Sequence, residues 1–293
     1  MNRKLLSLYG LKYNPFAQEV PAEALLSTPR IDSFLWRLEN AQVREGGFAL
    51  VTGDPGTGKS AVLRLTSERL GALGELKVGE IQHPQSNVAD FYRELGDVFN
   101  VPLRPHNRWA GFKTLRERWQ THIDSTLMRP VVMIDEAQQM SSSVMTELRV
   151  LSSTRFDSRI ILTVVLAGDS RLLERLRQEE LLPLGSRLRT RLVLEYADRD
   201  ELLGCLRHRL RAAGTASLMT PELMTTLVEH SGGNYRVLMN LCSDLLAAAA
   251  EREQTELDEK LYFDVFSPPG PKPEPDAPAR SRTGRGRNKE TRA

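Results

Sequence analysis

An eight-residue stretch, GDPGTGKS at residues 53–60, constrains the fold of this chain more than any other part of its sequence. It matches the GxxxxGK[ST] pattern in full. A short apolar run, FALVTG (48–53), precedes it and a helical pattern follows it. Glycines in such a loop allow successive backbone N–H groups to turn inward around a phosphate, and the start of the next helix adds positive potential. The stretch therefore predicts a phosphate-binding loop between a buried strand and a helix.

Two residue types in this loop have a defined chemical task. Lys59 is expected to reach the β- and γ-phosphates of a nucleotide, and Ser60 to offer its hydroxyl to Mg²⁺. A chance glycine-rich turn would not be expected to satisfy both the complete pattern and the strand–loop–helix context. We therefore predict that the chain binds ATP and Mg²⁺ here. The predicted nucleotide-binding residues of this stretch are Gly53, Asp54, Pro55, Gly56, Thr57, Gly58, Lys59, Ser60 and Ala61.

A second stretch, VVMIDE at residues 131–136, supplies the acidic residues that hydrolysis needs. Its apolar run delivers Asp135 to the carboxyl end of a strand, where parallel sheets bind ligands. Asp135 is predicted to hold Mg²⁺ through its water shell, and Glu136 to polarise the attacking water as a general base. The alternative is an acidic pair that only caps the following helix. Beside a phosphate-binding loop, the catalytic interpretation predicts an ATPase.

Apolar runs alternate with helical patterns along the middle of the chain, which indicates a parallel sheet with helices on both faces. The expected strands are 48–53, 76–81, 130–135, 160–168 and 190–196, and the expected helices include 59–73, 91–99, 109–127, 144–152 and 171–182. After Ala197 the strands stop and only helical patterns follow. We expect a leading segment (1–43), an α/β domain (44–197), a helical domain (198–266) and a C-terminal tail (267–293).

The tail, residues 267–293, differs from the rest of the chain in composition. It has seven Lys or Arg against three Asp or Glu and is rich in Pro and Gly, so we expect it to be disordered and basic.

No stretch of the chain approaches the ~18 apolar residues of a membrane helix, and the N-terminus lacks the features of a signal peptide. The only two cysteines, Cys205 and Cys242, are expected to be buried or half-buried thiols in a reducing cytoplasm.

Five motifs in order resemble the signature of an AAA+ ATPase: GDPGTGKS, MIDEAQQM, VVLAGD, GSRLRTRL and GGNYRVL. The resemblance covers roughly residues 8–265. Within that superfamily, YGLKYNPF ahead of the phosphate loop and DEAQ in the second motif resemble one branch, which contains secretion ATPases of the ExeA type and transposition helpers of the TniB and TnsC type. The resemblance implies a five-stranded parallel sheet sandwiched by helices, followed by a small helical lid.

The resemblance also implies roles for residues after the second motif. Asp169 stands at the end of the fourth strand, where the family has a polar sensor of the γ-phosphate. Arg187 stands in the place of the arginine finger, which reaches the nucleotide of a neighbouring subunit. Arg189 and Arg191 are alternates, and all three could instead be surface arginines. Arg236 stands where the family has its second sensor, or else forms a salt bridge within the lid.

At the N-terminus, the resemblance places Asn14, Pro15 and Phe16 near the adenine. The alternative is that Phe16 packs the N-terminal segment onto the core. Because an arginine finger acts across an interface, the resemblance further implies self-association into a ring or filament with ATP at each subunit boundary.

Two roles for the ATP cycle come from the same resemblance. The first is a cytoplasmic helper in DNA transposition that binds double-stranded DNA without sequence preference and activates a transposase or integrase. The second is a secretion-assembly ATPase at the cell envelope. The envelope ATPase of this branch has a membrane segment and a cell-wall-binding region after the ATPase. This chain ends in a basic polar tail, so the first role, with no membrane association, is expected. A metabolic kinase is disfavoured by the lid-like helices and the GSRLRTR stretch.

Two basic regions are candidates for binding the DNA backbone. One is the tail, where ~5 extra cationic contacts would make binding strongly dependent on salt. The other interleaves basic and aromatic residues: Arg104, His106, Arg108, Trp109, Lys113, Arg116, Arg118 and Trp119. Cations neutralise phosphates and aromatics pack on sugars or bases. The alternative is a solvated helix face whose tryptophans enter the core.

Overall fold

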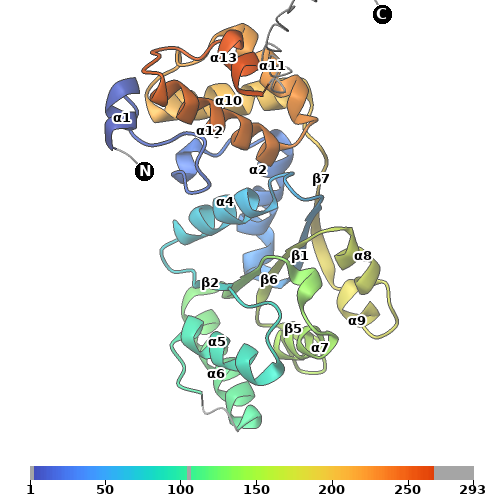
Figure 1. The fold of residues 1–293 in the computed structure, drawn as a ribbon. Coiled ribbons are helices and arrows are strands. Elements are labelled where there is room, and N and C mark those ends of the chain that lie inside the picture. Colours follow the sequence, from blue (N-terminus) through green and yellow to red (C-terminus); the bar gives the residue numbers. More distant parts are fainter. Residues whose placement is uncertain (1–2, 104–106, 267–293) are drawn as a thin grey trace, which may run out of the picture.

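The computed structural model describes residues 3–103 and 107–266 and is shown in Figure 1. A central sheet has helices on both faces, and a group of helices lies beyond one end of it. The predicted disorder of residues 267–293, and the predicted contacts of Arg104 and His106, lie outside the described residues.

Five parallel strands form the central sheet in the order β2-β3-β6-β1-β7. Their bounds are β1 Gly47–Gly53, β2 Val78–Ile81, β3 Val131–Ile134, β6 Thr163–Gly168 and β7 Leu188–Leu194. The predicted parallel five-stranded sheet is therefore confirmed. Because β1 lies between β6 and β7, the phosphate loop leaves the sheet near the ends of both strands.

Alternate residues of each strand face opposite sides of the sheet, so each strand contributes to two cores. On one side, Leu50 and Ile134 pack against a layer formed by α5, α6, α7, α8 and α9. On the other side, Val51 and Met133 pack against α2 and α4. The helices are α2 Pro29–Arg37, α4 Lys59–Gly71, α5 Val88–Phe99, α6 Arg108–Thr126, α7 Ser142–Leu151, α8 Ser170–Leu176 and α9 Leu182–Gly185.

One predicted strand and one predicted helix are each interrupted in the structure. The run 160–168 was expected to be one strand, but its first residue belongs to a separate hairpin, in which β4 (Ser153–Thr154) pairs with β5 (Arg159–Ile160). Ile161 and Leu162 between the two elements are fully buried, so an apolar pattern could not mark the change of partner strand. The expected helix 171–182 ends instead at Leu176 of α8, and Leu182 belongs to α9, which has Pro183 in its first turn.

The C-terminal helices form a separate core, the lid. They are α10 Arg199–Ala213, α11 Pro221–Ser231, α12 Tyr235–Glu251 and α13 Glu259–Phe266. Asp198 and Glu201 form a capping box at the start of α10, and the Thr220 side chain caps α11 ahead of Pro221. The N-terminal helix α1, Arg3–Tyr9, lies against this lid, since Tyr9 is part of the same core. Both cysteines are buried and free, as expected.

Candidate active site

The phosphate loop follows β1 and ends at the first residue of α4. Gly56 and Gly58 have φ values of +85° and +101°, a left-handed conformation that favours glycine. Gly53 is also required for space, because a Cβ there would lie 2.7 Å from the carbonyl oxygen of Leu194 on β7. The glycines of the motif therefore permit both the turn and its close fit against the sheet. The loop lies directly ahead of the N-terminus of α4, where an anion is stabilised.

Lys59 is the first residue of α4, and its side chain turns back into the loop. The Nζ ammonium donates hydrogen bonds to the carbonyl oxygens of Gly53, at 2.8 Å, and Asp54, at 3.1 Å. The residue is buried at 7% exposure, so the loop itself supplies these partners. The ammonium thus lies inside the loop, where nucleotide phosphates would meet it.

Ser60 and Asp135 come together although they are far apart in the sequence. The Ser60 hydroxyl donates a hydrogen bond of 2.7 Å to Oδ2 of Asp135, which directly follows β3. Within residues 3–103 and 107–266, no group of three or more His, Cys, Asp or Glu side chains is arranged to hold a metal. Magnesium usually takes one or two protein ligands and completes its shell with phosphate and water oxygens. A hydroxyl beside one carboxylate fits that requirement.

Glu136 lies next to Asp135 at the carboxyl edge of the sheet and has an uncommon backbone conformation. Its φ is +51°, in the left-handed region that residues with a side chain rarely adopt, and such residues cluster at functional sites. One carboxylate oxygen, Oε2, accepts a hydrogen bond of 2.6 Å from Nε2 of Gln138. A cavity of about 490 Å³ borders Ser60, Asp135 and Glu136, so water can reach this edge.

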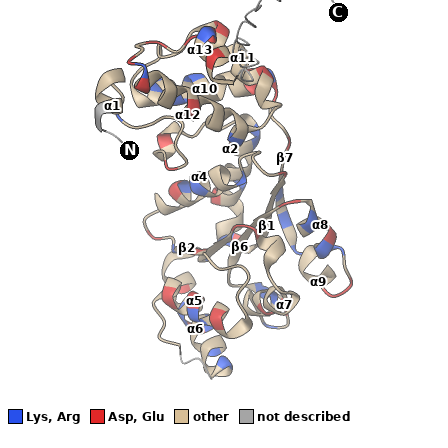
Figure 2. Ribbon diagram, viewed as in Figure 1, with Lys and Arg blue, Asp and Glu red and all other residues tan. Residues whose placement is uncertain are grey.

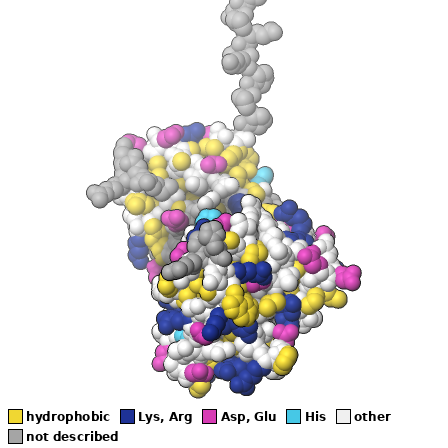
Figure 3. Space-filling view, turned by 90° about the horizontal axis from the view of Figure 1, so that it is seen from below, with side chains coloured by type: hydrophobic (Ala, Val, Ile, Leu, Met, Phe, Trp, Pro, Cys, Tyr) yellow, Lys and Arg dark blue, Asp and Glu magenta, His cyan; other side chains and the backbone are white. Residues whose placement is uncertain are grey.

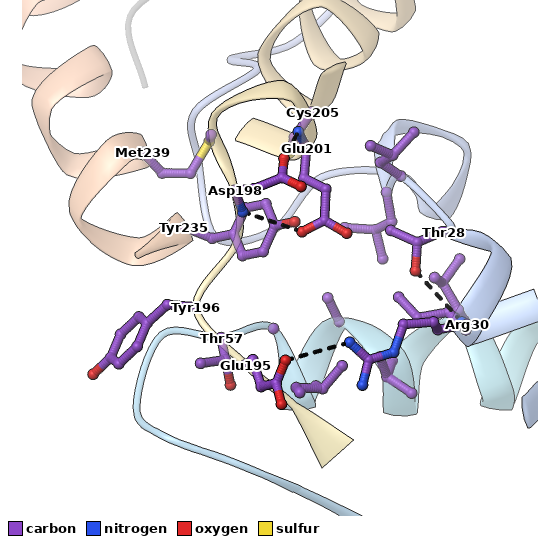
Figure 4. A pocket seen from close by; sticks show the side chains of 18 of the residues that line it. Thr28, Arg30, Thr57, Glu195, Tyr196, Asp198, Glu201, Cys205, Tyr235 and Met239 are labelled. Carbon is purple, nitrogen blue, oxygen red and sulfur yellow. Dashed lines mark hydrogen bonds and ion pairs between the residues drawn. The ribbon is translucent and has the colours of Figure 1, made fainter. Parts of the chain in front are cut away.

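A second cavity, of about 310 Å³, borders the phosphate loop at Thr57 and Gly58 (Figure 4). Four segments line it: the end of β7, the starts of α2 and α4, and the lid. Its lining includes Ile31, Thr57, Gly58, Ala61, Val62, Leu65, Val193, Tyr196, Tyr235 and Met239. The mixture of aliphatic and aromatic walls with a few polar groups suits an adenosine.

Asn14 and Phe16 do not line this cavity. Phe16 is 4% exposed within the lid core, and the side-chain oxygen of Asn14 accepts the backbone N–H of Phe16 at 3.0 Å. This is the packing role that the sequence left open as the alternative. Ala61, in contrast, is part of the cavity wall.

The polar groups of the cavity are mostly paired. Arg30 lies 3.6 Å from the Glu195 carboxylate and donates to the Val193 carbonyl oxygen at 3.1 Å. Burial raises the pKa of the Cys205 thiol, which keeps it protonated, so it is not a reactive nucleophile. Burial also raises the pKa of the Tyr235 hydroxyl. The cavity therefore has a binding surface without chemistry of its own.

The lid contacts the phosphate loop directly, a feature that the sequence analysis missed. Asn234 caps α12 and also donates from Nδ2 to the carbonyl oxygen of Pro55, at 3.0 Å. The backbone N–H of Tyr235 donates to the carbonyl oxygen of Gly56, at 3.1 Å. A Cβ on Gly56 would lie 2.1 Å from Asn234, so the two segments fit closely. The GGNYRVL motif contains both Asn234 and Tyr235, but it was used to predict the position of Arg236 alone.

We expect Asn234→Ala to weaken ATP binding by about 1 kcal/mol, roughly five-fold in Kd, because the phosphate loop loses its contact with the lid. Thr220→Ala is a matched control: it removes the cap of α11, worth ~1 kcal/mol, without a contact to the loop. Titration with a fluorescent ATP analogue and thermal unfolding would be measured for both. Equal Kd values for the two variants would show that the contact does not support binding.

Asp169, the predicted γ-phosphate sensor, directly follows β6 and caps α8. Its carboxylate accepts hydrogen bonds from the backbone N–H of Arg171, at 3.0 Å, and from its Nε, at 2.8 Å. The guanidinium of Arg171 and the nearby charge of Lys59 lower the pKa of Asp169. An acid at this position is therefore neutralised by a neighbouring cation, Arg171, which the sequence analysis did not single out.

The three candidate arginine fingers differ in their surroundings. Arg187 is bound to Asp157 of the β4–β5 hairpin, and its Nη1 is buried without a hydrogen-bond partner in the described part of the chain. Arg189, on β7, pairs with Glu45. Arg191, also on β7, is exposed, and Figure 2 shows this basic strand at the edge of the sheet. In the single subunit, none of the three lines the cavity of about 310 Å³ beside the phosphate loop.

Arg236, the predicted second sensor, is the second residue of α12. Its side chain is exposed and does not line the cavity either, although its backbone N–H is bound by the capping oxygen of Asn234. No ion pair involving its side chain is found among the described residues, so the lid salt bridge left open by the sequence is not observed.

The basic and aromatic stretch on α6 divides into buried and exposed parts. Trp119 is buried in the core, whereas Trp109 is 73% exposed and stacks on Phe112, with ring centroids 5.8 Å apart. The Arg116 guanidinium lies 4.7 Å above the Phe112 ring. Arg108 is paired with the buried carboxylate of Glu147. Figure 3 shows hydrophobic and basic side chains intermixed on the end of the molecule that carries this helix.

The central part of the chain is similar to a known family. Residues 42–176 match the family model described as AAA domain. The General secretion pathway protein A of Aeromonas hydrophila is 32% identical over 248 residues, which is 83% of this chain. The chain spans 44% of the length of that relative.

Solved structures share the fold at low sequence identity. The ORC2 protein of Aeropyrum pernix, in its ADPNP–ADP complexes, has a TM-score of 0.69 at 18% identity, covering 88% of this chain and 72% of that chain. The ORC1 protein of the same organism, solved in complex with DNA, has a TM-score of 0.59 at 16% identity, covering 90% and 68%. Across the described residues, no helix is both long and apolar enough to span a membrane.

Proposed function

Because this chain has the AAA+ P-loop fold and matches the AAA domain family over residues 42–176, we propose that it hydrolyses ATP with Mg²⁺ to ADP and phosphate. The single observation that carries the proposal is the meeting of two distant motifs at one sheet edge. Ser60, the last residue of the GDPGTGKS motif, hydrogen-bonds to Asp135, and Glu136 follows Asp135 in the chain. This is the arrangement that ATP hydrolysis requires.

Each residue is proposed to have one task. Lys59 binds the β- and γ-phosphates, and Ser60 and Asp135 hold Mg²⁺, which would offset the charge of the phosphates. Glu136 accepts a proton from the attacking water. Asp169 with its bound Arg171 lies at the end of β6, where it would contact the γ-phosphate or that water.

We further propose that the site is completed by a second subunit. No candidate arginine lines the nucleotide cavity of its own subunit, which is what a finger acting on a neighbour requires. Arg187 is the preferred finger, with Arg189 and Arg191 as alternates, and Arg236 would approach the γ-phosphate when the lid closes. Loss of the γ-phosphate would then loosen the boundary between subunits.

Two roles are proposed for this ATP cycle. The relative from A. hydrophila, named for the general secretion pathway, supports an assembly role in secretion. The similarity spans less than half of that relative. We propose that the shared part is the ATPase, which a protein with a different role could also contain. That second role is a cytoplasmic helper in DNA transposition, which would bind DNA and a transposase. The exposed Trp109, which stacks on the half-buried Phe112, and the Arg116 guanidinium above the Phe112 ring favour binding of a DNA backbone.

Sedimentation with plasmid DNA separates the two roles. The protein would be mixed with plasmid DNA and a slowly hydrolysed ATP analogue at low and at moderate salt, with Lys59→Ala as the control that cannot respond to nucleotide. Nucleotide-dependent co-sedimentation that weakens with salt would support the transposition role. Absence of DNA binding at low salt, with association instead with isolated envelope fractions, would support the secretion role and exclude the transposition role.

A further inference from the structure

A buried amide beside Glu136 has no task in the reaction described above. Gln138 is 8% exposed and lies in a short 3-10 turn, Ala137–Gln139, which directly follows Glu136. Its Nε2 donates a 2.6 Å hydrogen bond to Oε2 of Glu136. Burying a glutamine whose polar atoms are not all hydrogen-bonded costs free energy, so the presence of Gln138 at this position needs an explanation.

The orientation of this amide is fixed by its surroundings. Only the N–H side of an amide can face a carboxylate, because the oxygen would be repelled by it. The Oε1 atom points away and has no hydrogen-bond partner among the described residues. It lies beside Gly168 at the end of β6, where a Cβ would be only 2.5 Å from it. The absence of a side chain at Gly168 therefore leaves space for the Gln138 amide in the orientation that donates a hydrogen bond to Glu136.

The turn that carries Gln138 is anchored to the next helix. Nη1 of Arg175, on α8, donates 2.6 Å hydrogen bonds to the carbonyl oxygens of both Gln138 and Met140. Ala137 and Met140, on either side, are buried in the sheet core. The backbone below Gln138 is thus held from two directions, so its side chain is a rigid support rather than a mobile surface group.

We propose that Gln138 is a positioning residue for Glu136, which rests on the proposed role of Glu136 as general base. The hydrogen bond occupies Oε2, and Oε1 is left to accept a proton from the attacking water. As that proton moves to Oε1, the water oxygen forms a bond to the γ-phosphorus. The bond from that phosphorus to the bridging oxygen breaks, and the electron pair leaves with ADP. Loss of the support lets the carboxylate rotate away from the water, and a displacement of about 1 Å costs on the order of 100-fold in rate.

The test uses variants that separate hydrogen bonding from packing. Gln138→Glu keeps the size of the side chain but places an acceptor against Glu136, whereas Gln138→Ala removes the side chain. We expect both to lower kcat roughly 10- to 100-fold while the KM for ATP changes less than about two-fold. The control is Gln178→Ala, an exposed glutamine just after α8. A parent kcat in Gln138→Glu would overturn the proposal, even if Gln138→Ala were unstable.

A double variant distinguishes this proposal from the proposed function. If Gln138 acts only through Glu136, adding Gln138→Ala to Glu136→Gln should slow single-turnover hydrolysis no further, whereas a merely structural effect would add to it. A slow Glu136→Gln with a further additive loss would overturn the role of Gln138 and leave the general base intact. A Glu136→Gln variant at the parent rate would instead remove the basis of both.

Discussion

Replacing Glu136 by Gln is expected to leave ATP binding intact and to lower the rate of hydrolysis by about 100- to 10,000-fold, the usual contribution of a general base. The substitution keeps the size of the side chain but removes the carboxylate that would take a proton from water. The neighbouring hydrogen bond between Ser60 and Asp135, at 2.7 Å, is not altered, so the metal site should persist. A protein that binds ATP without hydrolysing it should accumulate in its assembled state.

Phosphate release, nucleotide titration and sedimentation with ATP would be measured side by side on the parent and on Glu136→Gln. Glu174→Gln is the control, because Glu174 is an exposed residue of α8 that lines neither of the two cavities at the site. The assignment of Glu136 fails if its variant releases phosphate as fast as the parent. If ATP binding is lost as well, the residue is needed for the structure of the site rather than for the proton transfer.

Lys59→Ala is expected to weaken ATP binding strongly. Removing one partner of a buried charge pair costs about 2–5 kcal/mol, which corresponds to roughly 30- to several-thousand-fold in Kd. The ammonium is held within the loop by the carbonyl oxygens of Gly53 and Asp54, so it is already in place when phosphates arrive. No other lysine is part of the loop or the cavity, and the loop would then bind phosphate by its backbone alone.

Equilibrium titration with labelled ATP measures this effect, and Lys260→Ala, which removes an exposed lysine of the lid, is the control for the change in charge. Thermal unfolding without nucleotide should be similar for all three proteins. An unchanged Kd for Lys59→Ala would contradict the assignment of the loop as the phosphate site.

The fold and the centre of the candidate site could be predicted because both are encoded locally. The phosphate loop needs glycines, a lysine and a hydroxyl at fixed spacing, and Asp135 needs only an apolar strand before it. The alternation of apolar runs with helical patterns was enough for the five strands of the sheet. The break after Ile160 was missed, because Ile161 and Leu162, which lie in it, are buried apolar residues like those of the strand that follows.

The supporting contacts could not be predicted, because they join residues through the fold rather than through spacing. Asn234 was part of the GGNYRVL motif, but its hydrogen bond to Pro55 depends on how the lid packs against the phosphate loop. Gln138 was part of the DEAQ motif, yet its task depends on the room left by Gly168. For Phe16, the resemblance predicted a position near the adenine. The structure instead places it in the lid core, which agrees with the alternative that it packs the N-terminal segment onto the core.

Hydrolysis by mixed subunits is the most direct test of the claim that ATP is hydrolysed between two copies of this chain. Lys59→Ala subunits bind no nucleotide but keep Arg187, and Arg187→Ala subunits bind nucleotide but lack the proposed finger. Each variant alone should be nearly inactive, and a mixture at a concentration where the parent assembles should regain a measurable share of parent ATPase activity. Activity of Arg187→Ala alone at the parent rate, or a mixture no more active than its two components, would contradict the account.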